Sequence, residues 1–215
     1  VDRSKDQSYL LHMLGQDQLA RSLFPVGGQE KAETRAHAMR LGLPVAGKPD
    51  SQEVCFVPGA DHGAFLARHA PDLVRPGEVV DPRGRTIAHH DGTFRFTIGQ
   101  RRGLGVSTGE RAYVVDMDGA ANRVMVGPGE LLGRRGLVAD HVSWVAGHPP
   151  ATGPFEADVR IRYKGDGVPA VVERLGEEVR VEFRRPERAV APGQSVVFYQ
   201  RNEVLGGGRI REALR

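Results

Sequence analysis

The C-terminal part of the sequence contains six short segments that each read as a β-strand, and this succession constrains the fold most. The segments are residues 137–145, 155–163, 170–174, 178–183, 195–200 and 204–211, and turns with Pro or Gly separate them. Apolar residues alternate along several segments, as in Val179, Val181 and Phe183. Such alternation places one face of a strand against a core. Six short strands with frequent turns predict a small closed barrel or a sandwich.

The N-terminal part has a helical pattern instead. Residues 5–24 predict one helix, which starts with a capping box of Ser4 and Gln7 or with Asp6 as an alternative cap. Residues 30–41 predict a second helix, which ends at Gly42 in a left-handed conformation. A short third helix is expected from residue 61 to about residue 69.

The middle of the chain changes to a period of two. Residues 78–81 with 85–88, and 112–117 with 123–126, predict two hairpins, and residues 95–98 predict another short strand. Residues 131–136 predict a linker. We therefore expect an α+β protein with a helical N-terminal segment (1–56), a small, mostly β central domain (57–132) and a C-terminal β domain (133–215).

The composition is that of a soluble globular protein, with 40% hydrophobic and 27% charged residues. A net charge of +3 permits nucleic-acid binding but does not require it. Most basic residues are Arg, which suits phosphate contacts, although a GC-rich genome produces the same bias. No membrane span and no signal-peptide core are expected. One cysteine fits a reducing cytoplasm, and the spacing of the His and Cys residues predicts no metal site.

The single cysteine lies in residues 48–56, Lys-Pro-Asp-Ser-Gln-Glu-Val-Cys-Phe. A lone cysteine cannot form an internal disulfide, so any chemical role of Cys55 is that of a thiolate. Pro44 and Pro49 favour an extended or loop approach to it, where a substrate could reach the thiol. Taken alone, a cysteine between Val54 and Phe56 is more often a small buried hydrophobe.

This stretch resembles the second cysteine motif of the bacterial tRNA 2-thiouridylases, the MnmA/TrmU family, which place sulfur on the wobble uridine of tRNA. Residues 4–9, Ser-Lys-Asp-Gln-Ser-Tyr, and residues 96–105, Phe-Thr-Ile-Gly-Gln-Arg-Arg-Gly-Leu-Gly, resemble two more motifs of the family in the same order. The resemblance extends from about residue 5 to about residue 205. It implies that the C-terminal domain is an antiparallel β-barrel like those of translation factors, and that residues 1–56 are a helical remnant of the catalytic domain bearing the Cys55 loop.

The resemblance also implies a chemistry for Cys55, which would carry a persulfide that attacks C2 of an adenylated uridine. The family's N-terminal ATP-binding domain, with its phosphate loop and a second catalytic cysteine, has no counterpart in these residues. ATP and Mg²⁺ are therefore expected to bind to that domain and not to this chain. The expected partners are the missing domain, a persulfide donor protein of a sulfur relay and the anticodon arm of tRNA, in the cytoplasm.

The resemblance further implies a set of tRNA contacts: Lys5, Asp6, Gln7, Arg162, Tyr163 and Gln194. Three observations on the residues themselves agree with phosphate binding. A helix N-terminus with a lysine suits an anion. A strand that continues to residue 164 would point Arg160, Arg162 and Lys164 to one face. Arg101 and Arg102 among glycines suggest a phosphate-binding loop.

Two other functions remain open without the ATP-binding domain. The chain could be a non-catalytic module that binds tRNA, in which case the same basic residues would matter and Cys55 would not. It could also be a sulfur carrier, which takes a persulfide on Cys55 and passes it to a partner.

Overall fold

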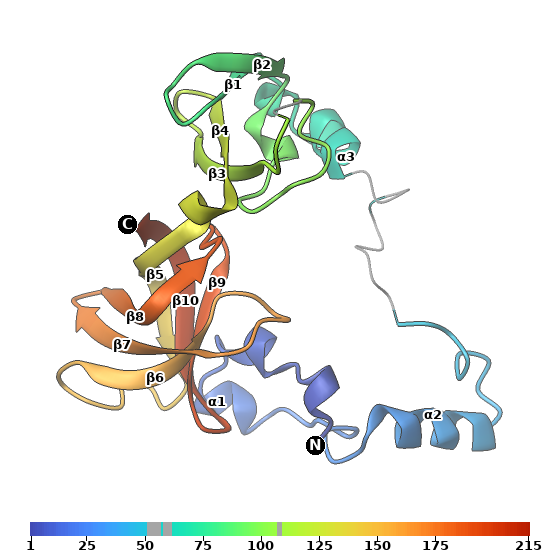
Figure 1. Cartoon of the computed structure of the whole chain (residues 1–215). Coiled ribbons are helices and arrows are strands. Elements are labelled where there is room, and N and C mark those ends of the chain that lie inside the picture. The colour runs from blue at the N-terminus through green and yellow to red at the C-terminus, as the bar shows by residue number, and fades with distance from the viewer. Residues whose placement is uncertain (51–56, 58–61, 107–108) are drawn as a thin grey trace. The chain divides into compact units, whose positions relative to one another are not determined.

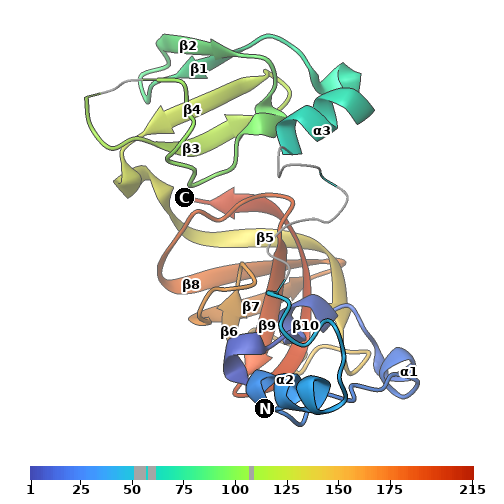
Figure 2. The same ribbon diagram turned by 90° about the vertical axis from the view of Figure 1, so that its right-hand side faces the viewer.

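Six strands in the C-terminal part close into a barrel, in the order β10–β5–β8–β7–β6–β9 (Figures 1 and 2). The strands are β5 (Gly133–Trp144), β6 (Phe155–Arg160), β7 (Val168–Leu175), β8 (Glu178–Arg188), β9 (Ser195–Gln200) and β10 (Glu203–Leu214). The pairs β6–β7, β7–β8, β6–β9 and β9–β10 are antiparallel. The α+β class with a C-terminal barrel is thereby confirmed, and the sandwich is excluded.

This computed structural model describes residues 1–50, 57, 62–106 and 109–215, so Cys55 lies outside the described residues. The chain divides into two units. One contains Val1–Ser51, Val138–Arg184 and Gly193–Arg211, and the other contains Gln52–Leu137, Arg185–Pro192 and Glu212–Arg215. The division into three domains expected from the sequence stays a prediction. No helix among the described residues is long and apolar enough to cross a membrane.

The barrel has a core of its own, built by the period-two pattern of the sequence. On β8 the side chains of Val179, Val181 and Phe183 are buried and the residues between them are exposed. Val196 and Phe198 are buried without measurable exposure on β9. Each such side chain contributes about 1.5–3 kcal/mol by leaving water, so the barrel does not depend on a single contact.

Strand β6 ends earlier than expected, and this corrects one sequence prediction. It stops at Arg160, and residues 161–164 form a bend and a turn, in which the Gly165 amide donates to the Arg162 carbonyl at 3.1 Å. The buried side chain of Ile161 fixes the bend. Arg160, Arg162 and Lys164 therefore do not form a row of cations on one face of a strand.

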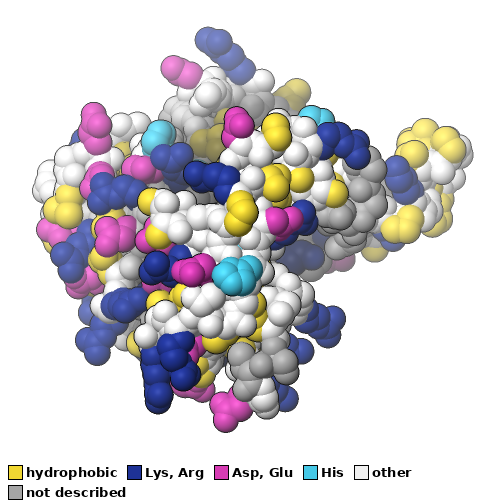
Figure 3. All heavy atoms as spheres, turned by 90° about the horizontal axis from the view of Figure 1, so that it is seen from above, with side chains coloured by type: hydrophobic (Ala, Val, Ile, Leu, Met, Phe, Trp, Pro, Cys, Tyr) yellow, Lys and Arg dark blue, Asp and Glu magenta, His cyan; other side chains and the backbone are white. Residues whose placement is uncertain are grey.

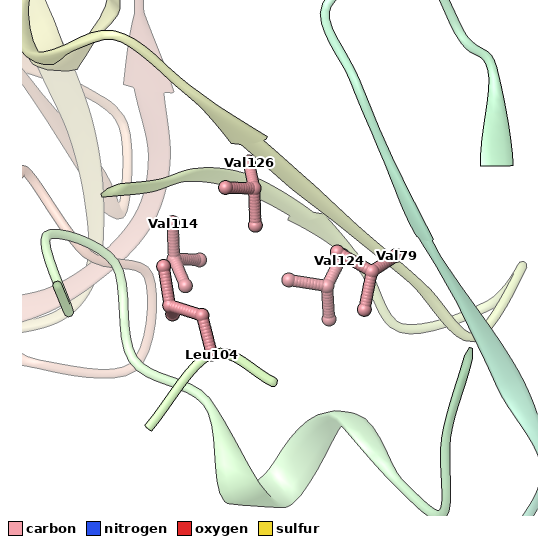
Figure 4. Packing of buried hydrophobic residues seen from close by; sticks show 5 residues of the cluster. All are labelled: Val79, Leu104, Val114, Val124 and Val126. Atoms are coloured by element: carbon pink, nitrogen blue, oxygen red, sulfur yellow. The ribbon is translucent and has the colours of Figure 1, made fainter. Parts of the chain in front are cut away.

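The second unit contains a four-stranded sheet with the order β2–β1–β4–β3. Its strands are β1 (Gly77–Val80), β2 (Thr86–His90), β3 (Tyr113–Asp118) and β4 (Arg123–Gly127). The hairpins β1–β2 and β3–β4 are antiparallel, as predicted, and β1 pairs with β4 in parallel, which makes the sheet mixed. Its core is a cluster whose side chains point toward one another in Figure 4: Val79, Leu104, Val114, Val124 and Val126.

One prediction for this unit is wrong. Residues 95–98 form no strand: Thr93–Arg95 is a 3-10 helix, and Phe96 and Ile98 pack on the core cluster from a connecting segment. Residues 131–136, expected as a linker, are regular in structure, because a 3-10 helix (Gly129–Leu132) leads directly into β5, and the two units meet in sequence between Leu137 and Val138. The buried Arg134 guanidinium fastens this stretch by donating to the carbonyls of Leu131, Gly133 and Val115 at 2.7–3.0 Å.

The N-terminal segment is not one helix from residue 5 to residue 24. It contains two 3-10 helices, Arg3–Lys5 and Ser8–Leu11, and one turn of α-helix, α1 (Gln16–Leu19). The expected capping box is absent from this described segment: Ser4 bonds to Asp2, and Asp6 accepts the Ser8 amide. Helices α2 (Lys31–Arg40) and α3 (His62–His69) are confirmed, and Gly42 has the expected left-handed φ of 64°.

Candidate functional site

The N-terminal segment lies on the barrel, and Tyr9 is its anchor. The Tyr9 side chain is 6% exposed and packs with Val197, Tyr199, Tyr163 and Val204. Its hydroxyl donates to the Ser195 carbonyl at 2.7 Å, across 186 residues of sequence. Burial raises the pKa of Tyr9 to about 12, so the phenol stays neutral and remains a donor. Tyr9 thus fixes the residues before it against β9.

Asp6 makes the next contact between the segment and the barrel. Its Oδ2 lies 3.3 Å from Arg160 Nη1, and the Arg160 guanidinium lies 4.3 Å from the centre of the Tyr199 ring. Burial tends to raise the pKa of Asp6, but hydrogen bonds from Ser8 and Arg160 outweigh it and lower the pKa overall. The Ser8 and Tyr199 hydroxyls are also 3.2 Å apart. The charge of Arg160 is therefore largely engaged within the protein.

Gln7 connects two groups of residues that the sequence singled out separately. Its Nε2 donates to the Tyr163 hydroxyl at 2.9 Å, and the Tyr163 ring centre lies 6.3 Å from that of Tyr9. Arg162, the residue before Tyr163, is exposed. Residues 5–7 and residues 162–163 therefore belong to one surface, although more than 150 residues separate them.

Gln194 lies at the edge of the same contact. It is exposed, and it directly precedes Ser195, whose carbonyl holds Tyr9. Its backbone is fixed because Gly193, with a φ of 89°, turns the chain and the Gln194 carbonyl accepts the Ile210 amide at 2.8 Å. All six residues expected to contact tRNA thus lie on or beside the contact between the N-terminal segment and the barrel.

A glycine in β10 explains how closely the segment approaches. A Cβ atom on Gly207 would lie 2.8 Å from His12 Nδ1 and 2.5 Å from the Val196 carbonyl oxygen. His12 is 5% exposed, and its burial lowers its pKa, so it is neutral in the folded protein. The glycine run at residues 206–208 lies within β10, with a register shift between Val204 and Gly206.

Asp50, the last described residue before Cys55, is bound by three cations. Its carboxylate lies 2.8 Å from Lys5 Nζ, 3.3 Å from Lys31 Nζ and 3.4 Å from Arg35 Nη2. The hydrogen bond from Lys5 is the main cause that lowers the pKa of Asp50 to about 2, and the same contact raises the pKa of Lys5. The N-terminal segment and α2 together hold the start of the cysteine stretch.

Three other basic residues that the sequence suggested as phosphate contacts are not among the cations around Asp50. Lys164 is exposed in the turn after β6, and Arg101 and Arg102 are exposed in the other unit. On the face seen in Figure 3, Lys and Arg side chains are interspersed with Asp and Glu side chains. The described residues contain no group of three metal-ligating side chains.

Sequence reasoning missed the roles of Ser8, Tyr9, His12 and Tyr199 in this contact. It also missed Asp50 as a charge centre that binds Lys31 and Arg35. Tyr9 and Asp50 lie within the motifs at residues 4–9 and 48–56, but these motifs do not show which residues they contact. Tyr199 carried no local signal, because its partners Ser8 and Arg160 lie elsewhere in the sequence.

Three models of related domains match the chain in succession. They are the tRNA methyl transferase HUP domain over residues 1–59, the tRNA methyl transferase PRC-barrel domain over residues 63–128 and the aminomethyltransferase beta-barrel domain over residues 134–210. The matched residues extend through nearly the whole chain.

Curated relatives agree with these matches. The tRNA-specific 2-thiouridylase MnmA of Roseiflexus sp. (strain RS-1) is 51% identical over 211 residues, which cover 98% of this chain and 56% of the relative. The protein of the same name from Symbiobacterium thermophilum is 47% identical over 215 residues, 100% of this chain and 55% of the relative. The protein of the same name from Geobacter metallireducens is 50% identical over 216 residues, which cover 99% of this chain and 58% of the relative. The chain spans a little over half the length of these relatives.

Proposed function

This chain belongs to the family of tRNA-specific 2-thiouridylases, and we propose that it supplies the sulfur-carrying cysteine and a tRNA-binding surface for 2-thiolation of the wobble uridine. The observation that carries the proposal is the hydrogen bond between Gln7 and Tyr163. It joins two sequence motifs that were each expected to contact tRNA, on a surface that also includes Lys5, Arg162 and Gln194. Because the two motifs lie side by side, one RNA arm can contact both of them.

In this proposal Cys55 is the sulfur donor. Its thiolate receives a sulfane sulfur from a persulfide donor protein, by thiol exchange at the donor's persulfide. The terminal sulfur then forms a bond to C2 of the uridine. A second cysteine, on the N-terminal domain of the family, attacks the Cys55 sulfur, so that 2-thiouridine leaves and a protein disulfide forms. An external thiol reduces this disulfide. ATP with Mg²⁺, bound by that domain, supplies the activation of the uridine oxygen as a leaving group.

The described N-terminal segment supports the need for a partner domain. Large apolar side chains are exposed there: Leu10, Met13, Leu23, Phe24, Val26, Met39, Leu41 and Val45. Where such side chains form one contiguous patch, they mark an interaction surface. We propose that the ATP-binding domain covers these residues in the complete enzyme.

The test is sulfur incorporation into unmodified tRNA with ATP, Mg²⁺ and a persulfide donor. We expect no 2-thiouridine from this chain alone, and product once the N-terminal domain is added as a separate protein. Cys55→Ser in the assembled enzyme should abolish sulfur transfer and leave the Kd for tRNA nearly unchanged. Product from the chain alone would contradict the assignment of the ATP site to the missing domain. A large loss of affinity in the variant would contradict the catalytic role of Cys55.

A second candidate function is a tRNA-binding module without chemistry. It is supported by one observation: the N-terminal segment contacts the barrel through Gln7–Tyr163 and Tyr9–Ser195, so the two expected tRNA-contact motifs lie on one surface. Under this function Arg162→Gln lowers the affinity for tRNA and flattens its salt dependence by roughly 0.7–0.9 in slope, as loss of one phosphate contact does. An unchanged slope would remove Arg162 from the binding surface under either function.

A further inference from the structure

Three cations from two segments of the chain converge on one carboxylate. Lys5 comes from the first 3-10 helix, and Lys31 and Arg35 come from consecutive turns of α2. Their side chains remain 48%, 44% and 40% exposed, whereas that of Asp50 is 29% exposed. The cations thus keep much of their surface in contact with solvent while they share a single counter-ion.

A single carboxylate does not balance this charge. Like charges that are held close together repel one another, and exposed ion pairs stabilise a fold only weakly. Asp2 lies beside the cluster, but its carboxylate accepts the backbone amides of Ser4 and Lys31. The donors of two ammonium groups and a guanidinium exceed what one carboxylate accepts, so further anionic oxygens can bind here.

The position of the cluster indicates which anion it receives. Lys5 directly precedes Asp6 and Gln7, which lie against the barrel in the proposed tRNA-binding surface. Lys31 and Arg35 extend that surface onto α2. A backbone phosphate carries two free oxygens and one negative charge, and it matches both an Arg fork and the neighbouring ammonium groups.

We propose that Lys5, Lys31 and Arg35 form a binding site for a backbone phosphate of the bound tRNA, and that Asp50 is the internal counter-ion that this phosphate displaces. The inference rests on the proposed function and adds α2 to it. It gives Lys31 and Arg35 a role in binding. It also makes tRNA binding compete with the contacts of Asp50, which precedes Cys55 by five residues.

The test measures the Kd of this chain for a fluorescent, unmodified anticodon stem-loop at several KCl concentrations. The double variant Lys31→Gln and Arg35→Gln should bind roughly three- to tenfold more weakly, and the slope of log K against log salt should fall by about 1. Arg40→Gln is a control on the same helix. It removes one positive charge, whereas the double variant removes two, and 3.6 residues per turn direct Arg40 about 140° away from Arg35. It should leave the slope unchanged.

The variant Asp50→Asn tests whether Asp50 is a counter-ion that the phosphate displaces or a carboxylate that the fold needs. If the phosphate replaces Asp50, the variant binds the stem-loop several-fold more tightly with an unchanged melting temperature. Weaker binding, or an unchanged slope in the double variant, overturns the proposal but leaves the proposed function standing if Arg162→Gln still lowers the slope. Failure of the wild-type chain to bind the stem-loop overturns both.

The phosphates of a free nucleotide offer the same chemistry as an RNA backbone phosphate. A competition experiment distinguishes these two ligands. Pyrophosphate is added to the complex with the stem-loop at constant ionic strength. We expect no displacement at millimolar pyrophosphate. Displacement from the wild-type chain that is lost in the double variant would assign the site to nucleotide phosphates and overturn the proposal.

Discussion

Tyr9→Ala should release the N-terminal segment from the barrel and leave the barrel folded. The Tyr9 ring is 6% exposed among Val197, Tyr199 and Tyr163, and truncation of a buried aromatic side chain to Ala costs about 3–5 kcal/mol. The hydrogen bond to the Ser195 carbonyl accounts for about 1 kcal/mol of this. The barrel retains its own buried side chains, so the cost falls on the docked segment.

The magnitude determines what an experiment should detect. Since 1.4 kcal/mol is a factor of ten, the population of the undocked segment should rise by roughly 10²- to 10³-fold or more. The amides of Lys5, Leu10 and Leu14 are hydrogen-bonded within this segment, so their hydrogen exchange reports its release. The amide of Ile210, bonded to Gln194 in the barrel, reports the barrel.

The assay is hydrogen exchange measured by mass spectrometry on wild type and variant. Peptides from residues 3–14 should exchange faster by the stated factor, while barrel peptides stay protected. Leu10→Ala, next to Tyr9 but more than half exposed, is the control and should change little. Tyr9→Phe should give an intermediate effect, because it leaves the Ser195 carbonyl without its donor. Equal loss of protection in the barrel would show that Tyr9 belongs to the barrel core and refute the reasoning.

Three further predictions concern stability. Arg134→Leu leaves the carbonyls of Leu131, Gly133 and Val115 without this donor and should lower the free energy of unfolding by about 3 kcal/mol, which urea titration measures. Burial lowers the pKa of His12, so the stability it contributes is complete above pH 6.5 and is lost as the pH falls toward its lower folded pKa. Urea titrations at pH 7.5 and 5.5 should show a smaller difference in His12→Gln, and an equal difference would contradict this. Gly207→Ala places a methyl group against His12 and the Val196 carbonyl and should cost about 1–3 kcal/mol. Gly47→Ala, with open space at its Cβ position, should melt like wild type.

Structural elements that depend on residues close together in the sequence were predicted correctly. The six barrel strands and the two hairpins of the central sheet follow from alternation between turns, and α2 and the left-handed Gly42 follow from helix periodicity and a glycine stop. The helix expected over residues 5–24 is wrong because the first 3-10 helix, which Asp2 caps, ends at Asp6 with a ψ of 121°, and the Asp6 side chain accepts the Ser8 amide. Burial of Tyr9 and His12 on the barrel then outweighed helix propensity.

Two other wrong predictions, the strands over residues 95–98 and 161–164, also result from burial of side chains in the tertiary structure. Phe96 and Ile98 alternate like a strand, but they do so because both side chains pack on the core cluster from a connecting segment. Residues 161–164 were read as part of a strand, whereas the buried Ile161 and the turn to Gly165 end β6 at Arg160. In both cases tertiary packing, which the local pattern does not contain, decided the backbone.

The sequence by itself determined the α+β class, most strands, the family and the identity of the motif residues, because these depend on residue type and on spacing along the chain. Only the tertiary structure decided which of them meet. Gln7 reaches Tyr163, Asp6 reaches Arg160 and Tyr9 reaches Ser195 because the closed barrel presents one surface to the N-terminal segment. The convergence of Lys5, Lys31 and Arg35 on Asp50 has the same origin, since each pair depends on how the chain folds back over tens of residues.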